Sequence, residues 1–177
     1  MTRSRAFASL TAMSTAPVRI CFVCLGNICR SPTAEGVMKM LVAEAGLSER
    51  IAVESAGTGN YHVGEPADRR SAAAARARGV ELTGCARQFV PADFDRFDYI
   101  VAMDRRNFGF LKRLARKPEH VARVSLLRAF DPESVKAEQD DVPDPYFDDN
   151  FDEVFDICKA GCSGLLRTIV ERHNLSA

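Results

Sequence analysis

Cys24 and Arg30 are the two residues whose types and spacing point most directly to chemistry, with five residues between them. A thiol attacks as the thiolate, which nearby cations and a helix N-terminus stabilise. The guanidinium of Arg30 can bind two oxygens of a phosphate at once, whereas a lysine would offer a single point charge. The pair therefore predicts displacement at phosphorus by sulfur, through a cysteinyl-phosphate intermediate.

The segment between these residues has the composition of an anion-binding loop. Gly26 and Asn27 readily adopt positive φ, which lets backbone N–H groups turn toward one space. Ser31 and Pro32 follow as an expected N-cap and first helical residue, and a helix N-terminus adds partial positive charge. We expect Ser31 also to donate a hydrogen bond to the Cys24 sulfur. The predicted phosphate-binding residues are Leu25, Gly26, Asn27, Ile28, Cys29, Arg30 and Ser31.

Apolar runs that alternate with helix-periodic segments supply the elements that position this loop. The segment 128–150, in which proline recurs, is expected to be a functional loop without helix. The expected strands are 18–23, 51–56, 98–103 and 121–127, and the expected helices are 35–46, 67–78, 104–115 and 152–173.

This alternation predicts an α/β fold, a single domain with a four-stranded parallel sheet and helices on both faces. Ligands of such sheets bind beyond the carboxyl ends of the strands. The loop after Cys24, the loop after the second strand, Asp104 after the third and Asp144 after the fourth should therefore converge on one site.

Asp144 is the candidate proton donor, because it lies in a stiff loop between Pro143 and Pro145 at the correct end of the sheet. It would protonate the departing alcohol and then, as a carboxylate, activate the water that hydrolyses the intermediate. Tyr146 and Phe147 follow, and their rings could line a cleft that receives an aromatic leaving group. An Asp-Pro pair is also ordinary turn chemistry, so these residues alone leave both interpretations open.

The amino-acid composition limits the classes of partner and the compartment that we expect. The 24 basic and 24 acidic residues include no long basic block, which argues against nucleic acid and anionic membranes as partners. No apolar run approaches the roughly 20 residues of a membrane span. Six cysteines in a domain of this size predict reduced thiols in the cytoplasm, with Cys158 and Cys162 as core residues. The three scattered histidines predict no metal site.

Residues 1–16 contain Arg, Ser, Thr and Ala but no acid. That composition resembles an organelle transit peptide, and the simpler alternative is a disordered N-terminal extension. We adopt the extension, which leaves residues 17–177 as the catalytic domain.

Three motifs together are similar to those of the low-molecular-weight protein tyrosine phosphatases: Cys24–Glu35, Phe97–Asp104 and Asp144–Phe147. The resemblance runs from about Val18 to Arg172. It implies a flavodoxin-like phosphatase that uses no metal or cofactor, acts on phosphotyrosine in proteins, and releases inorganic phosphate, its product and inhibitor. Cys24 would be the nucleophile, Arg30 the phosphate and transition-state ligand, and Asp144 the general acid.

The same resemblance implies supporting roles. Asn27, Ser31 and Ser55 would hold the loop by hydrogen bonds, and Asp104 would orient Arg30. Gly84 stands where some members have a histidine of this network. The expected substrate cleft consists of Ile28, Tyr61, Tyr146 and Phe147, of which only Tyr146 remains as a possible phosphorylation switch.

Cys29 is close enough in sequence to Cys24 to form a disulfide on oxidation, which would protect the nucleophile from over-oxidation. The alternative is a small buried residue that packs under the loop.

Three other functions compete. Arsenate reductases of this fold would need further cysteines after the third strand, where Met103 and Phe110 stand. Protein arginine phosphatases tend to carry threonine in mid-loop, where this chain has Ile28, whose apolar side chain better suits a phenyl ring. A non-catalytic phosphotyrosine-binding module would lack the nucleophile and the acid, and both are present.

Overall fold

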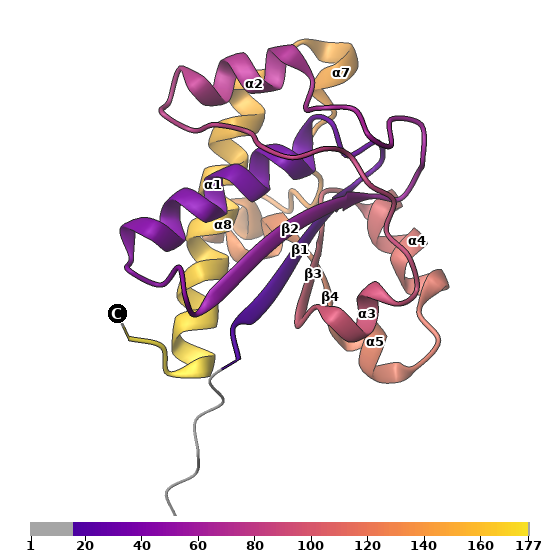
Figure 1. The fold of residues 1–177 in the computed structure, drawn as a ribbon, viewed down its shortest axis with the longest axis vertical. Helices are drawn as coiled ribbons and strands as arrows, with labels where there is room; N and C mark the ends of the chain where they lie inside the picture. The colour runs from indigo at the N-terminus through magenta and orange to yellow at the C-terminus, as the bar shows by residue number, and fades with distance from the viewer. Residues whose placement is uncertain (1–15, 177) are drawn as a thin grey trace, which may run out of the picture.

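The computed structural model describes residues 16–176, and its centre is a sheet of four parallel strands in the order β2-β1-β3-β4 (Figure 1). The strands are β1 (Val18–Cys24), β2 (Ile51–Gly57), β3 (Tyr99–Ala102) and β4 (Val124–Leu126). β1 pairs with β2 along its whole length, from Val18 with Ile51 to Cys24 with Gly57. The predicted α/β architecture is confirmed, and the loop after Cys24 leaves the middle of the sheet.

Helices cover both faces of the sheet (Figure 1). On one face lie α1 (Arg30–Glu44), α2 (Arg69–Arg76) and the long C-terminal α8 (Phe151–His173). The other face carries α3 (Asp93–Arg96), α4 (Arg105–Leu114) and α5 (Pro118–Ala122). The remaining short helices are η1 (Leu127–Phe130), α6 (Pro132–Lys136) and α7 (Pro145–Asp148).

Alternate residues of β1 serve the two cores. Ile20 and Phe22 pack in the core beneath α1 and α8, whereas Cys21 and Val23 pack in the core on the α4 side. All four side chains are fully buried. A strand covered on both faces has no polar side, which explains why the sequence shows a continuous apolar run there.

The predicted bounds of α2, α4 and α8 are close to the observed ones, but α1 begins at Arg30, before the predicted start at 35. The helix expected over 67–78 spans Arg69–Arg76, because the Asp68 side chain accepts a hydrogen bond from the Arg70 N–H and caps it. The strand expected over 121–127 is wrong in its first part, where α5 begins at Pro118 and β4 is reduced to three residues.

The expectation that 128–150 contains no helix is also wrong. Pro132 and Pro145 stand at the first position of α6 and α7, where proline is compatible with a helix because that N–H needs no partner. Asp131 and Asp144 precede them and cap the two helices with their carboxylates. Aspartate followed by proline here starts a helix.

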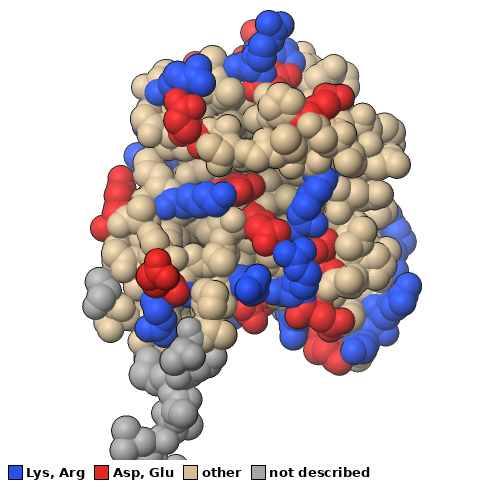
Figure 2. Space-filling view, viewed as in Figure 1, with Lys and Arg blue, Asp and Glu red and all other residues tan. Residues whose placement is uncertain are grey.

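The predicted extension over residues 1–16 lies outside the described residues except for Ala16, so it stays a prediction. No helix within 16–176 has the length and apolar character needed to cross a membrane. Acidic and basic side chains are interspersed on the face drawn in Figure 2.

Candidate active site

The loop between β1 and α1 wraps around the Cys24 sulfur. The Asn27 N–H donates to Cys24 Sγ over 3.2 Å, and the Ser31 hydroxyl lies 3.0 Å from the same atom. Asn27 adopts the left-handed conformation, with φ of 57°, as expected for a loop that turns its N–H groups inward. Cys24 is only 3% exposed, so its sulfur lies at the bottom of the loop.

The predicted N-cap at Ser31 is wrong. α1 begins at Arg30, and Cys29 is its cap residue. Among the described residues no side chain caps this terminus. The Ser31 hydroxyl is instead turned to the Cys24 sulfur, and an uncapped helix N-terminus is a site that favours an anion.

Arg30 connects three of the converging loops. Its guanidinium donates to Asp104 over 2.6 Å, to Asp144 over 2.9 Å and to the Val142 carbonyl over 3.2 Å. Burial alone would lower the pKa of Arg30, but Cys24, Asp144 and Asp104 together raise it above its ordinary value. Arg30 is therefore a permanent positive charge beside the sulfur.

Asp144 lies at the edge of the site. One carboxylate oxygen accepts from Arg30, and the other accepts from the Tyr146 N–H over 3.2 Å at the start of α7. Its side chain is 34% exposed, compared with 15% for Asp104. A carboxyl group in this position can reach both the buried site and solvent.

One pocket brings the predicted catalytic and cleft residues together. Leu25, 48% exposed, lies at its rim, and Ile28, 8% exposed, is a buried part of its lining. The rings of Tyr146 and Phe147 meet edge to face, with centroids 5.2 Å apart. The residues that line this pocket are Cys24, Leu25, Gly26, Ile28, Cys29, Arg30, Tyr61, His62, Asp144, Tyr146 and Phe147.

The predicted supporting residues also meet. The Asn27 side-chain NH₂ donates to the Ser31 hydroxyl over 2.9 Å and to the Ser55 hydroxyl over 2.8 Å. Its carbonyl oxygen accepts from the Arg87 backbone N–H over 3.0 Å. Glu35 completes this network by accepting from Ser55.

A sequence model of the family described as low molecular weight phosphotyrosine protein phosphatase matches residues 19–175. The chain belongs to this family. A low molecular weight protein-tyrosine-phosphatase of Streptomyces coelicolor is 44% identical over 156 residues, which cover 87% of this chain and 94% of the relative. The resemblance that the three motifs indicated is thereby confirmed, and with it the assignment as a phosphatase.

Solved structures of low molecular weight phosphatases and related proteins share the fold. That of YfkJ from Bacillus subtilis is 40% identical, has a TM-score of 0.83, and covers 88% of this chain and 96% of its own. A structure described as an arginine phosphatase of Drosophila is 30% identical with a TM-score of 0.77, covering 84% of this chain and 96% of its own. The flavodoxin-like fold is confirmed.

Sequence reasoning missed three residues at the site of this phosphatase. His62 lines the pocket and pairs with Glu65, and a Cβ at Gly26 would lie 3.0 Å from its ring. Its only sequence signal was its position after Tyr61. Glu35 ends the first motif and Arg87 lies far along the chain, so neither carried a sign of its hydrogen bonds.

Cys29 is a buried residue of the loop between β1 and α1 in this phosphatase. Burial raises the pKa of its thiol to about 12, although the nearby Ser71 hydroxyl opposes the shift. Since a thiolate is the attacking form, this environment slows disulfide formation with Cys24. All six cysteines are free thiols, and the redox role of Cys29 stays a prediction.

Proposed function

We propose that this phosphatase hydrolyses phosphotyrosine in protein substrates through a cysteinyl-phosphate formed on Cys24. The observation that carries the proposal is that Cys24, Arg30 and Asp144 line a single pocket whose outer walls are Tyr61 and Tyr146. An aromatic wall suits a phenyl ring, and a thiol beneath a helix N-terminus suits its phosphate.

The phosphate would be bound by the backbone N–H groups of the loop and by Arg30. The loop residues are those predicted from the sequence, and Asn27 supplies the left-handed turn. Arg30 would take two equatorial oxygens, with Asp104 holding the far side of its guanidinium. This geometry directs phosphorus toward the sulfur for in-line attack.

In the first step the Cys24 thiolate forms a bond to phosphorus while the bond to the tyrosine oxygen breaks. Asp144 gives its proton to the departing phenolate, so tyrosine leaves as the neutral phenol. An incoming phosphate competes with Asp144 for the Arg30 guanidinium, which frees the carboxyl group for this role. The Ser31 hydroxyl hydrogen-bonds the sulfur before attack and after release.

In the second step water attacks phosphorus and the sulfur leaves as the thiolate. The Asp144 carboxylate takes the proton of that water, which restores both groups. Inorganic phosphate is the product, and because it fits the same loop it would also inhibit.

The alternative of a protein arginine phosphatase shares the fold but differs at mid-loop. Ile28 presents an apolar side chain to the pocket, with Tyr61 and Tyr146 beyond it. This lining supports an aryl substrate. Side-by-side assays on phosphotyrosine and phosphoarginine peptides separate the two activities, and faster turnover of phosphoarginine would favour the alternative.

We further propose that the protein acts in the cytoplasm on phosphoproteins. Its free thiols support a reducing compartment.

The deciding experiment compares wild type with Cys24→Ser on p-nitrophenyl phosphate and on phosphotyrosine peptides, with EDTA present. Loss of the thiolate should lower kcat by at least ~10³-fold, because a serine hydroxyl is a far weaker nucleophile at neutral pH. Exposed Cys85 provides the control as Cys85→Ser, which should retain activity. Activity retained by Cys24→Ser would overturn the mechanism.

A further inference from the structure

A chain of hydrogen bonds leads away from the Cys24 sulfur and ends on α1. It runs from Cys24 to the Ser31 hydroxyl, then through the Asn27 side-chain NH₂ to the Ser55 hydroxyl, and from there to the carboxylate of Glu35. Each contact is between 2.5 and 3.0 Å long. The chain joins the nucleophile to a residue eleven positions away that does not line the substrate pocket.

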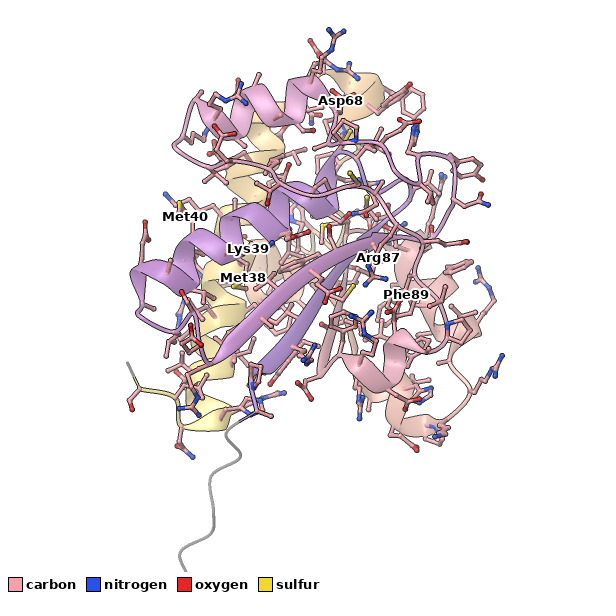
Figure 3. All side chains as sticks on the ribbon, in the orientation of Figure 1. Met38, Lys39, Met40, Asp68, Arg87 and Phe89 are labelled. Carbon is pink, nitrogen blue, oxygen red and sulfur yellow. The ribbon has the colours of Figure 1, made fainter. Side chains whose placement is uncertain are left out.

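The direction of these hydrogen bonds is fixed at one end by Arg87, which lies on the segment between α2 and α3 (Figure 3). Its backbone N–H can only donate, and it donates to the Asn27 side-chain oxygen. The two hydrogens of the Asn27 amide therefore face Ser31 and Ser55, and both hydroxyls act as acceptors toward Asn27.

Each hydroxyl then has one hydrogen of its own to donate. Ser31 has the Cys24 sulfur at 3.0 Å, with the Ala56 carbonyl more distant at 3.4 Å. Ser55 donates to Glu35 over 2.5 Å. A carboxylate can only accept, so it holds Ser55 in the orientation that Asn27 requires.

Glu35 is well placed for this task. Its side chain is 15% exposed, and its second oxygen accepts from Lys39, which lies one turn further along α1 (Figure 3). The ion pair with Lys39 orients the Glu35 carboxylate. Gly84, with φ of 96°, has no side chain to offer in the hollow shared by Glu35, Ser55 and Asn27.

We propose that Glu35 is a positioning residue of the phosphatase reaction: by accepting the Ser55 hydrogen it holds Asn27 in its left-handed turn, and so keeps Ser31 as a donor to the Cys24 sulfur. The proposal rests on the proposed role of Cys24 as nucleophile. Asn27 tolerates the left-handed conformation, and its side-chain hydrogen bonds select that conformation over the alternatives.

Glu35→Gln tests the proposal with nearly the same shape. The new amide can donate to Ser55, which turns the Ser55 hydrogen back toward the Asn27 NH₂ and sets two donors against each other. Ser55→Ala removes the same link from the other side. Glu44→Gln is the matched control, because Glu44 is an exposed glutamate on the same helix.

Two measurements are needed: kcat and KM on p-nitrophenyl phosphate, and the pH dependence of iodoacetamide alkylation, followed at the Cys24 peptide by mass spectrometry. Glu35→Gln and Ser55→Ala should each lower kcat roughly tenfold, as for loss of a hydrogen bond to a charged group. The alkylation midpoint should move to higher pH, because the thiolate loses its donor. The loss of kcat in the double variant should be no greater than the larger of the two single losses, since both substitutions break the same chain of hydrogen bonds.

A purely electrostatic role for Glu35 predicts the opposite shift. Removal of a negative charge near the site would favour the thiolate and move the midpoint to lower pH. A lower or unchanged midpoint in Glu35→Gln, or losses that add in the double variant, would overturn the proposal. If Glu35→Gln does not fold, Ser55→Ala compared with Ser55→Thr, which keeps the hydroxyl, gives the same test.

Alkylation needs no turnover, so it separates the two proposals. Activity retained by Cys24→Ser would refute the nucleophile, whereas an unmoved alkylation midpoint would refute only the role of Glu35.

Discussion

Arg30 forms salt bridges with two carboxylates, Asp104 and Asp144, which differ in burial and in their other hydrogen bonds. Asp104 is more buried and caps α4 by accepting from the Asn107 N–H over 2.7 Å. Asp144 is more exposed and, within residues 16–176, accepts only the longer 3.2 Å hydrogen bond from Tyr146 besides its contact with Arg30. In the proposed mechanism, a phosphate that binds Arg30 therefore displaces Asp144 and leaves Asp104 in place. The arrangement assigns a fixed role to Asp104 and a variable one to Asp144.

The proton-donor role of Asp144 predicts a leaving-group dependence. Asp144→Ala should lower kcat by about 10²-fold or more on phenyl phosphate, because acid catalysis contributes on this order when the leaving group is a weak acid. The loss should be smaller on p-nitrophenyl phosphate, whose more acidic phenol needs less help. Steady-state kinetics on a series of aryl phosphates measures the difference.

The matched control is Asp148→Ala, which removes an exposed acid from the same short helix, α7. It should leave kcat unchanged on every substrate. A loss in Asp144→Ala that is equal across leaving groups would mean that the carboxylate acts only through Arg30.

At the level of elements, α8 packs closely against the 3₁₀ turn η1. A Cβ built at Gly164 would lie 1.8 Å from the Phe130 carbonyl oxygen, and one at Gly161 would lie 2.6 Å from the Leu127 side chain. The two glycines let the helix backbone approach η1. Because α8 also packs against α1, this contact ties the segment that leads to Asp144 to the helix that begins with Arg30.

Gly164→Ala should therefore destabilise the fold. The methyl group meets backbone, which cannot rotate away, so the cost should be at least the ~1–3 kcal/mol of overpacking in other cores. Denaturant unfolding measures this as a lower free energy of unfolding. Gly109→Ala in α4 is the control, since its Cβ would meet only the flexible Arg113 side chain at 3.3 Å.

In the control position alanine has the higher helix propensity, so Gly109→Ala should be neutral or stabilising by up to about 1 kcal/mol. Wild-type stability in Gly164→Ala would show that η1 can move aside, and that the close approach is not needed.

At the scale of the whole molecule, the site was predictable where it depends on sheet topology. Parallel strands end at one edge, so the loops that carry Cys24, Asp104 and Asp144 had to meet, and hydrophobic periodicity located those strands. The residue types then indicated the chemistry that we propose. The cleft residues followed because Tyr61 and Tyr146 lie on two of the same loops.

The remainder depends on contacts that sequence periodicity does not encode. Arg87 supports Asn27 through its backbone N–H, which any residue but proline could supply. His62 lines the pocket, and Glu35 accepts a hydrogen bond from Ser55 on β2; both positions depend on how distant segments pack. Recurrent proline argues against a helix, yet proline is well suited to a first helical turn, and α6 and α7 begin at Pro132 and Pro145.

Arg30 links the helices on the two faces of the sheet. We therefore predict that a phosphate bound at Arg30 stabilises the whole fold. Arg30 is the first residue of α1 on one face of the sheet, and it forms a salt bridge with Asp104, which precedes α4 on the other face. Because the site exists only in the folded protein, inorganic phosphate at 100 times its Kd should raise the free energy of unfolding by about 2.7 kcal/mol. Denaturant titrations in phosphate and in chloride at equal ionic strength separate binding from screening.

Arg30→Lys should lose most of this stabilisation, because lysine keeps the charge but not the two-pronged donor set that binds two oxygens. Arg105→Met is the control: Arg105 is an exposed neighbour at the start of α4 that bonds Asp141, and its removal should leave the phosphate effect intact. Equal stabilisation of Arg30→Lys and wild type would mean that the loop backbone and the helix N-terminus bind the anion without the guanidinium. In that case Arg30 would act on the transition state alone, and its loss would appear in kcat with the phosphate Kd unchanged.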